Sequence, residues 1–119
     1  MKPESVIQHE IVKFYTNTYC LVHHSPRCLI ASIPNGGFRN QREAVTLKST
    51  GALAGASDMI LIHRKSLDKP SILAFIEVKT QVGLQSDVQK SFMNRVLDLG
   101  FKYTIVRNLE DFKDFIFKL

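Results

Sequence analysis

The sequence predicts a single α/β domain in which a mixed sheet is flanked by helices. Its 119 residues are enough for one hydrophobic core, and we expect one domain over residues 1–119. Helical and extended patterns follow one another in the order α-β-α-β-β-α-β-α, with no internal repeat or low-complexity linker. Apolar residues make up 45% of the chain and charged residues 23%, which excludes a wholly disordered protein.

The first half of the chain begins with a predicted helix over residues 4–15. Its apolar side chains recur at helical spacing, Pro3 precedes it, and Glu4 lies in its first turn, as the start of a helix favours. Short apolar runs bounded by glycine and proline then indicate strands. We expect a strand over 28–33, a short helix over 40–47 and a strand over 58–63.

The second half opens with a more apolar strand over residues 72–79. It follows the strand over 58–63 closely enough for the two to form a hairpin. Helical periodicity resumes over residues 86–99, with Ser86 at a capping position and Gly100 at the end. The remaining elements are a strand over 102–106 and a helix over 109–117.

Charge and composition limit the class of protein. The formal net charge of +5 permits a polyanionic partner such as nucleic acid. No stretch approaches the roughly 20 apolar residues of a membrane span, and the polar first residues do not resemble a secretory signal. Cys20 and Cys28 lack the spacing of a metal site or a disulfide scaffold. We therefore expect no membrane partner and a cytoplasmic location, in a bacterial cell or a virus-infected host cell.

Candidate catalytic residues are ionisable groups where the pattern expects apolar ones. Glu77 and Lys79 end the strand ILAFIEVK, and residues two apart on a strand project from the same face. Asp58 opens the preceding strand, so an antiparallel hairpin brings its carboxylate next to Glu77. Two such carboxylates repel one another unless a cation lies between them, and hard oxygens suit Mg²⁺. The alternatives are a turn-forming aspartate and a solvated surface ion pair.

Two helical residues fit the same interpretation. Glu10 falls between Val6 and Phe14 inside the apolar arc of its helix, where a glutamate is costly unless it is paired, protonated or metal-bound. Gln89 lies on the apolar side of the helix over 86–99 and needs hydrogen-bond partners there. The alternatives are a glutamate at the edge of the arc that reaches solvent, and a solvated glutamine in the first turn.

Basic and polar side chains near the second predicted helix are candidates for phosphate contacts, although solvated charge is the ordinary use of such residues. The candidate DNA-binding residues are Asn35, Arg39, Arg42, Lys48 and Ser86.

The ordered set of Glu10, Asp58, Glu77-Val78-Lys79 and Gln89 resembles the PD-(D/E)xK nuclease superfamily. More closely, nearly the whole chain resembles the virus-type replication-repair nuclease domain, VRR-NUC. That family has a Lys-x-x-Gly-x-x-x-Gly-x-x-Asp stretch before its Glu-x-Lys, and this chain departs from the superfamily pattern by a serine before the aspartate. The matching residues are the loop from Pro34 to Arg39, then Lys48, Gly51, Gly55 and Asp58, and after Lys79 the residues Gly83, Ser86 and Gln89.

The resemblance implies a restriction-endonuclease-like αβββαβ core and a DNA endonuclease that depends on Mg²⁺ or Mn²⁺. It implies that Asp58, Glu77 and the backbone carbonyl of Val78 bind the metal, and that Glu10 binds it directly or through water. Lys79 would orient the attacking water and offset developing charge. Gln89 would hold Lys79 or that water.

Stand-alone members of the family resemble junction-resolving enzymes that act as homodimers. We therefore expect structure-selective cleavage of four-way (Holliday) junctions in DNA replication, repair or recombination. The alternatives are a flap-directed or non-selective nuclease, a catalytically silent DNA-binding domain of the same fold, and a small structural protein. The terminal helix offers apolar side chains for either a dimer surface or the core, namely Phe112, Phe115, Ile116 and Phe117.

Overall fold

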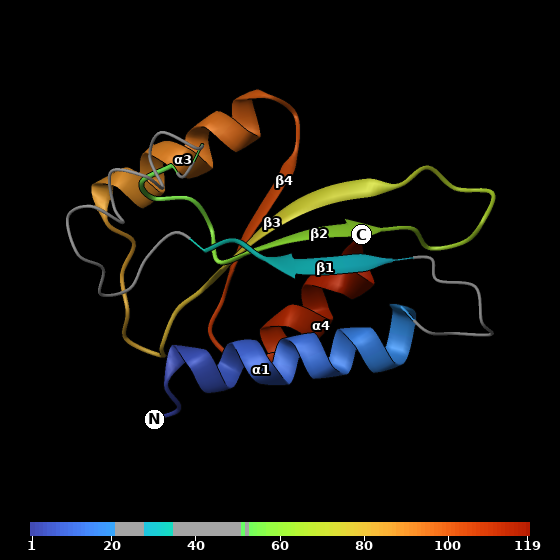
Figure 1. Cartoon of the computed structure of the whole chain (residues 1–119), viewed down its shortest axis with the longest axis horizontal. Coiled ribbons are helices and arrows are strands. Elements are labelled where there is room, and N and C mark those ends of the chain that lie inside the picture. Colours follow the sequence, from blue (N-terminus) through green and yellow to red (C-terminus); the bar gives the residue numbers. More distant parts are fainter. Residues whose placement is uncertain (21–27, 35–50, 52) are drawn as a thin grey trace.

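The computed structural model describes residues 1–20, 28–34, 51 and 53–119, and within them it contains one four-stranded sheet between two layers of helices (Figure 1). The strands lie in the order β1-β2-β3-β4. The elements are α1 (Glu4–Tyr15), η1 (Thr16–Cys20), β1 (Leu29–Ser32), β2 (Met59–His63), β3 (Ile72–Val78), α3 (Asp87–Asp98), β4 (Lys102–Val106) and α4 (Leu109–Lys118).

The sheet is mixed. β1 pairs with β2 and β2 with β3 in antiparallel fashion, whereas β4 runs parallel to β3. Because the hairpin reverses the chain, the start of β2 lies next to the end of β3, at one end of the two central strands. The parallel partner also ends there, since the Lys79 amide donates to the carbonyl of Val106 at 3.0 Å. Of the predicted catalytic residues, Asp58, Glu77 and Lys79 lie at these strand ends.

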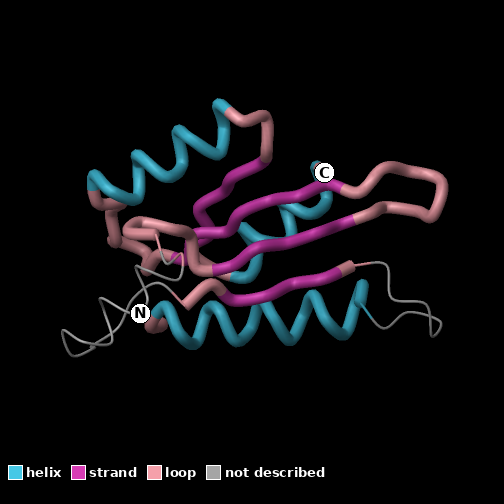
Figure 2. The backbone as a smooth tube through the Cα atoms, turned by 45° about the horizontal axis from the view of Figure 1, so that its top comes forward, coloured by secondary structure: helices cyan, strands magenta, loops and turns pink. Residues whose placement is uncertain are grey.

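The hydrophobic core lies between the sheet and the pair α1 and α4, on the face opposite α3 (Figures 1 and 2). β2 alternates in burial because successive side chains point to opposite faces, and Met59, Leu61 and His63 point towards this core. In α4, Phe112 and Ile116 are buried while Phe117 is 86% exposed. Phe112 and Ile116 therefore belong to the core, not to a dimer surface.

The α/β architecture expected from the sequence is confirmed, and the predicted elements agree with those observed to within two residues at each end. The chain continues past α1 in a π-helical turn, η1, which the sequence pattern did not define. The predicted helix over 40–47 lies outside the described residues. Among the described helices, none is long and apolar enough to span a membrane.

Candidate active site

The hairpin register brings the carboxylates of Asp58 and Glu77 together. Met59 pairs with Ile76, so the residues one step further along each strand, Asp58 and Glu77, face each other across the hairpin. Asp58 Oδ2 accepts a hydrogen bond of 2.8 Å from the amide of Val78, which fixes the aspartate at the end of β3. The sequence-based juxtaposition is therefore present in the structure.

Glu77 is nearly inaccessible to solvent, with its side chain 3% exposed. Gln89 Nε2 donates to Glu77 Oε1 at 2.9 Å, and Lys79 Nζ lies 3.7 Å from the same oxygen. The other oxygen, Glu77 Oε2, is buried without a hydrogen-bond partner among the described residues. A buried carboxylate oxygen without a donor is costly, and a bound cation would supply the partner that this atom lacks.

The electrostatics of the cluster point the same way. Burial raises the pKa of Glu77 to about 7 from its ordinary 4.5. The charge of Asp58 adds to this rise, Lys79 opposes it, and Glu4 adds a smaller contribution. With both carboxyl groups ionised, two carboxylates and one ammonium leave a net negative charge in the cluster, which a divalent cation would more than offset.

The donor set fits a hard divalent metal. Mg²⁺ binds proteins through one or two carboxylates and keeps several waters, so Asp58, Glu77 and the Val78 carbonyl are a sufficient set of oxygens. No group of three His, Cys, Asp or Glu side chains with metal-binding geometry occurs in the part of the chain that is described. A metal held here would therefore depend on the backbone carbonyl and on water or substrate oxygens for its remaining ligands.

Gln89 has two roles, and neither is contact with Lys79. Its Oε1 accepts a hydrogen bond from the backbone amide of Ser86 at 2.8 Å, and its backbone amide donates to Ser86 Oγ at 3.3 Å. Together these bonds form a capping box at the start of α3. Its Nε2 is then directed at Glu77. The alternative of a merely solvated glutamine is wrong, because Gln89 contacts Ser86 and Glu77. That Gln89 holds the attacking water stays a prediction.

Gly55 explains why small residues precede Asp58. Its φ of +81° lies in the left-handed region, and a Cβ there would be 2.2 Å from the carbonyl oxygen of Val88 and 2.8 Å from the amide nitrogen of Gln89. The loop before β2 therefore packs directly on the backbone of α3's first turn. This contact joins the segment that carries Asp58 to the segment that carries Gln89.

Glu10 forms an ion pair with a residue outside the Asp58 and Glu77 cluster. Its side chain is 30% exposed and pairs with Lys2 at 2.9 Å, so the alternative of an edge glutamate describes its environment. The acidic residue of α1 whose charge acts on Glu77 is Glu4, in the first turn. Glu10 as a metal ligand stays a prediction. Sequence periodicity missed Glu4 because it was assigned to the start of the helix.

Arg107 is a second residue that the sequence did not indicate. Its Nη1 donates to the carbonyls of Thr80 and Gly83, both at 2.7 Å, and so it holds the loop that directly follows Lys79. A Cβ on Gly83 would lie 3.4 Å from Lys79 Cδ, in contact with the lysine stem. This loop therefore restricts where the Lys79 side chain can go.

Of the predicted DNA-binding residues, Asn35, Arg39, Arg42 and Lys48 lie outside the described residues. Ser86 is described, and its hydroxyl caps α3. Direct contact of Ser86 with DNA stays a prediction.

Comparison with known families decides the relationship. The model of the VRR-NUC domain matches residues 2–108, which is most of the chain. The chain belongs to the VRR-NUC family. VRR-NUC domains are nuclease domains of the PD-(D/E)xK type, so the family indicates a nuclease and agrees with the Asp58, Glu77 and Lys79 cluster described above.

A solved structure of a "VRR_NUC domain protein" is similar to this VRR-NUC chain in fold, with a TM-score of 0.72 at 19% sequence identity. The similarity covers 99% of this chain and 89% of the other. No curated protein matches the sequence.

The Gly55 contact yields a prediction with a matched control. Gly55→Ala should lower the free energy of unfolding by more than about 2 kcal/mol, because it adds a backbone clash to left-handed strain. Gly51 also has a positive φ, +104°, but open space around it. Gly51→Ala should therefore lose only about 1 kcal/mol. Chemical denaturation measures both, and equal losses would show that the contact with α3 does not matter.

Repulsion within the cluster yields a second prediction. Asp58→Asn should raise the free energy of unfolding in chelator by about 1 kcal/mol at pH 8, because it removes a like charge beside Glu77. The folded-state pKa of Glu77 is raised to about 7, so ionised Glu77 destabilises the fold as pH rises from 4.5 towards 7. The gain should therefore vanish below about pH 4.5.

The control for this experiment is Asp114→Asn, an exposed carboxylate on α4. It should change the stability little at either pH. A destabilised Asp58→Asn protein at pH 8 would show that the hydrogen bond from Val78 outweighs the repulsion.

Proposed function

We propose that this chain is a metal-dependent endonuclease that hydrolyses phosphodiester bonds in DNA. The observation that carries the proposal is the buried Glu77 carboxylate, one oxygen of which lacks a partner among the described residues while Asp58 and Lys79 flank it. Membership of a nuclease family supports the same conclusion. A silent DNA-binding domain would have no need of two adjoining carboxylates facing a phosphate.

Asp58, Glu77 and the Val78 carbonyl would hold Mg²⁺ or Mn²⁺, with Glu10 as a further ligand, directly or through water. The metal would supply Lewis-acid polarisation of the phosphate and a water of lowered pKa. Two carboxylates on neighbouring strands are well suited to this task, because the hydrogen-bonded ends of β2 and β3 restrict their movement.

Lys79 acts on the attacking water and on the charge that develops at the phosphate. Its side chain is 11% exposed, and its Nζ is close to Glu77, so the ammonium is held facing the cluster. Gln89 acts through Glu77, which it orients by the 2.9 Å hydrogen bond. Water attacks phosphorus and the bond to the 3′-oxygen breaks, which leaves a 5′-phosphate and a 3′-hydroxyl that takes up the proton.

For substrate choice we propose branched DNA, with four-way junctions as the principal class, cut by a homodimer. Two symmetry-related sites can cut two strands of a junction, which one site cannot do in a single encounter. Phe117, at the exposed end of α4, is a candidate for the contact between subunits. A flap-directed or non-selective nuclease is the alternative within the same chemistry.

The role of Lys79 can be tested directly. Lys79→Ala should lower kcat by about a hundredfold or more, because a group that acts on the attacking water is lost. Affinity for DNA in Ca²⁺ should change by less than about threefold, since one ion pair with phosphate contributes little. Lys118→Ala, at the exposed end of α4, is the control. Wild-type cleavage by a folded Lys79→Ala protein would overturn the assignment.

The substrate class can be tested with a panel of single-stranded, duplex, flap and four-way junction DNAs in Mg²⁺ or Mn²⁺. We expect paired incisions in the junction, no cleavage in chelator, and a mass of two chains at micromolar concentration. Equal rates on all four DNAs would favour a non-selective nuclease. Tight DNA binding in chelator without any cleavage in metal would favour the silent domain.

A further inference from the structure

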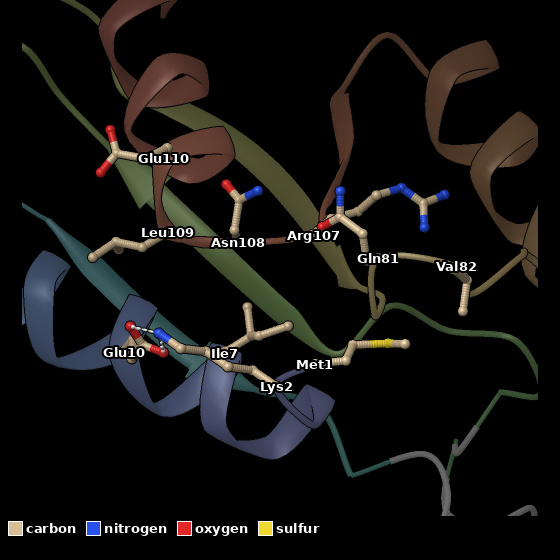
Figure 3. Close-up of a pocket in the computed structure, with 10 residues that line it drawn as sticks. All are labelled: Met1, Lys2, Ile7, Glu10, Gln81, Val82, Arg107, Asn108, Leu109 and Glu110. Carbon is tan, nitrogen blue, oxygen red and sulfur yellow. Dashed lines mark hydrogen bonds and ion pairs between the residues drawn. The ribbon is translucent and has the colours of Figure 1, made fainter.

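A cavity of about 550 Å³ is lined in part by the loop that follows Lys79, and the chemistry above assigns it no occupant. It is formed by the first turns of α1, the loop after Lys79, and the connection between β4 and α4 (Figure 3). In Figure 3, Ile7 extends from α1 into this space, and Val82 comes from the loop. The volume is within the range of ligand sites in proteins.

The cavity and the catalytic cluster share one wall. Gln81 and Val82 line the cavity and follow Lys79 by two and three residues. Arg107 holds this loop through the carbonyls of Thr80 and Gly83, so the wall is anchored on the β4 side. A group bound in the cavity would therefore lie across a single loop from the lysine that acts on the scissile phosphate.

The two basic side chains that line the cavity, Lys2 and Arg107, already have partners. Lys2 pairs with Glu10 at 2.9 and 3.1 Å, and Arg107 Nη1 binds two backbone carbonyls. The start of α4, which would otherwise attract an anion, carries Glu110 as a further lining residue. A phosphate would meet this carboxylate, while the two side-chain cations of the lining already have partners. These contacts favour an uncharged ligand.

The remaining lining residues have either apolar side chains or uncharged polar ones. Ile7, Val82 and Leu109 supply aliphatic surface, and Gln81 and Asn108 supply carboxamides. Aliphatic walls suit the faces of a flat ring, and carboxamides can both donate to and accept from its edge. A nucleobase has these properties and is attached to the same strand as the phosphate that is cut.

We propose that this cavity receives an unstacked nucleobase next to the scissile phosphate. The inference rests on the proposed function and adds a source of substrate preference. Removing a base from a duplex stack costs a few kcal/mol, and the cost is least where the base is already unpaired. A nuclease that needs one unstacked base would thus favour junctions, flaps and mismatches over continuous duplex without reading their sequence.

The test uses Gln81→Ala/Val82→Ala, which removes one carboxamide and one apolar wall. Leu84→Ala is the matched control, because Leu84 belongs to the same loop, is 82% exposed and does not line the cavity. DNA that the wild type cuts is labelled with 2-aminopurine at each nucleotide flanking the cleaved phosphate, and binding is measured in Ca²⁺. We expect a fluorescence rise at one flanking nucleotide with wild type and control, and less than half of it with the double variant.

Cleavage of the same DNA in Mg²⁺ completes the test. On base-paired DNA the double variant should lose about tenfold in kcat/KM, the size expected for one lost base contact. On DNA with an abasic residue at the responding nucleotide, wild type and double variant should agree within about twofold, because the two losses concern one interaction. The double variant should also fold as the wild type does.

The outcomes separate the two proposals. A wild-type protein that cuts no DNA removes the nuclease proposal and this one with it. A wild type that cuts DNA, with no fluorescence response at any flanking nucleotide or with a double variant as active as the Leu84→Ala control, removes the nucleobase site alone.

Discussion

The arrangement of the candidate site depends on one buried carboxylate. Glu77 sits at the end of a central strand with one oxygen bound by Gln89 and approached by Lys79, while the other has no partner among the described residues. Burial and the neighbouring Asp58 both oppose its ionisation. A protein selected for stability alone would replace such a group by an apolar residue, so its presence indicates that function has determined this position.

The first turn of α3 is where three segments of the chain meet around that carboxylate. The loop with Gly55 packs on the backbone of Val88, and Ser86 and Gln89 cap the helix through one another. The side-chain carboxamide of Gln89 accepts a hydrogen bond in the cap through its oxygen and donates one to Glu77 through its nitrogen. One side chain therefore both caps α3 and orients the Glu77 carboxylate, so a change at Gln89 affects both.

Most of the fold could be predicted from periodicity, because core-facing strands and helices carry clear patterns of two and of 3.6 residues. The pairing of Asp58 with Glu77 followed from the hairpin alone. The packing partner of Gly55, the double role of Gln89 and the loop contacts of Arg107 could not be predicted, since each depends on tertiary approach. Glu10 and Glu4 both lie on α1, and only the direction in which the helix crosses the sheet decides which carboxylate acts on Glu77.

The antiparallel register of β2 and β3 has a consequence for the population of molecules in a preparation. A shift of one residue would turn Asp58 to the opposite face of the sheet while leaving a paired, apolar hairpin. The alternating burial of β2 opposes such a shift, because it would move Met59 and Leu61 out of the core. The same apolar side chains that stabilise the domain therefore also fix the register of β2 and β3. A correctly folded molecule thus has both carboxylates on one face of the sheet.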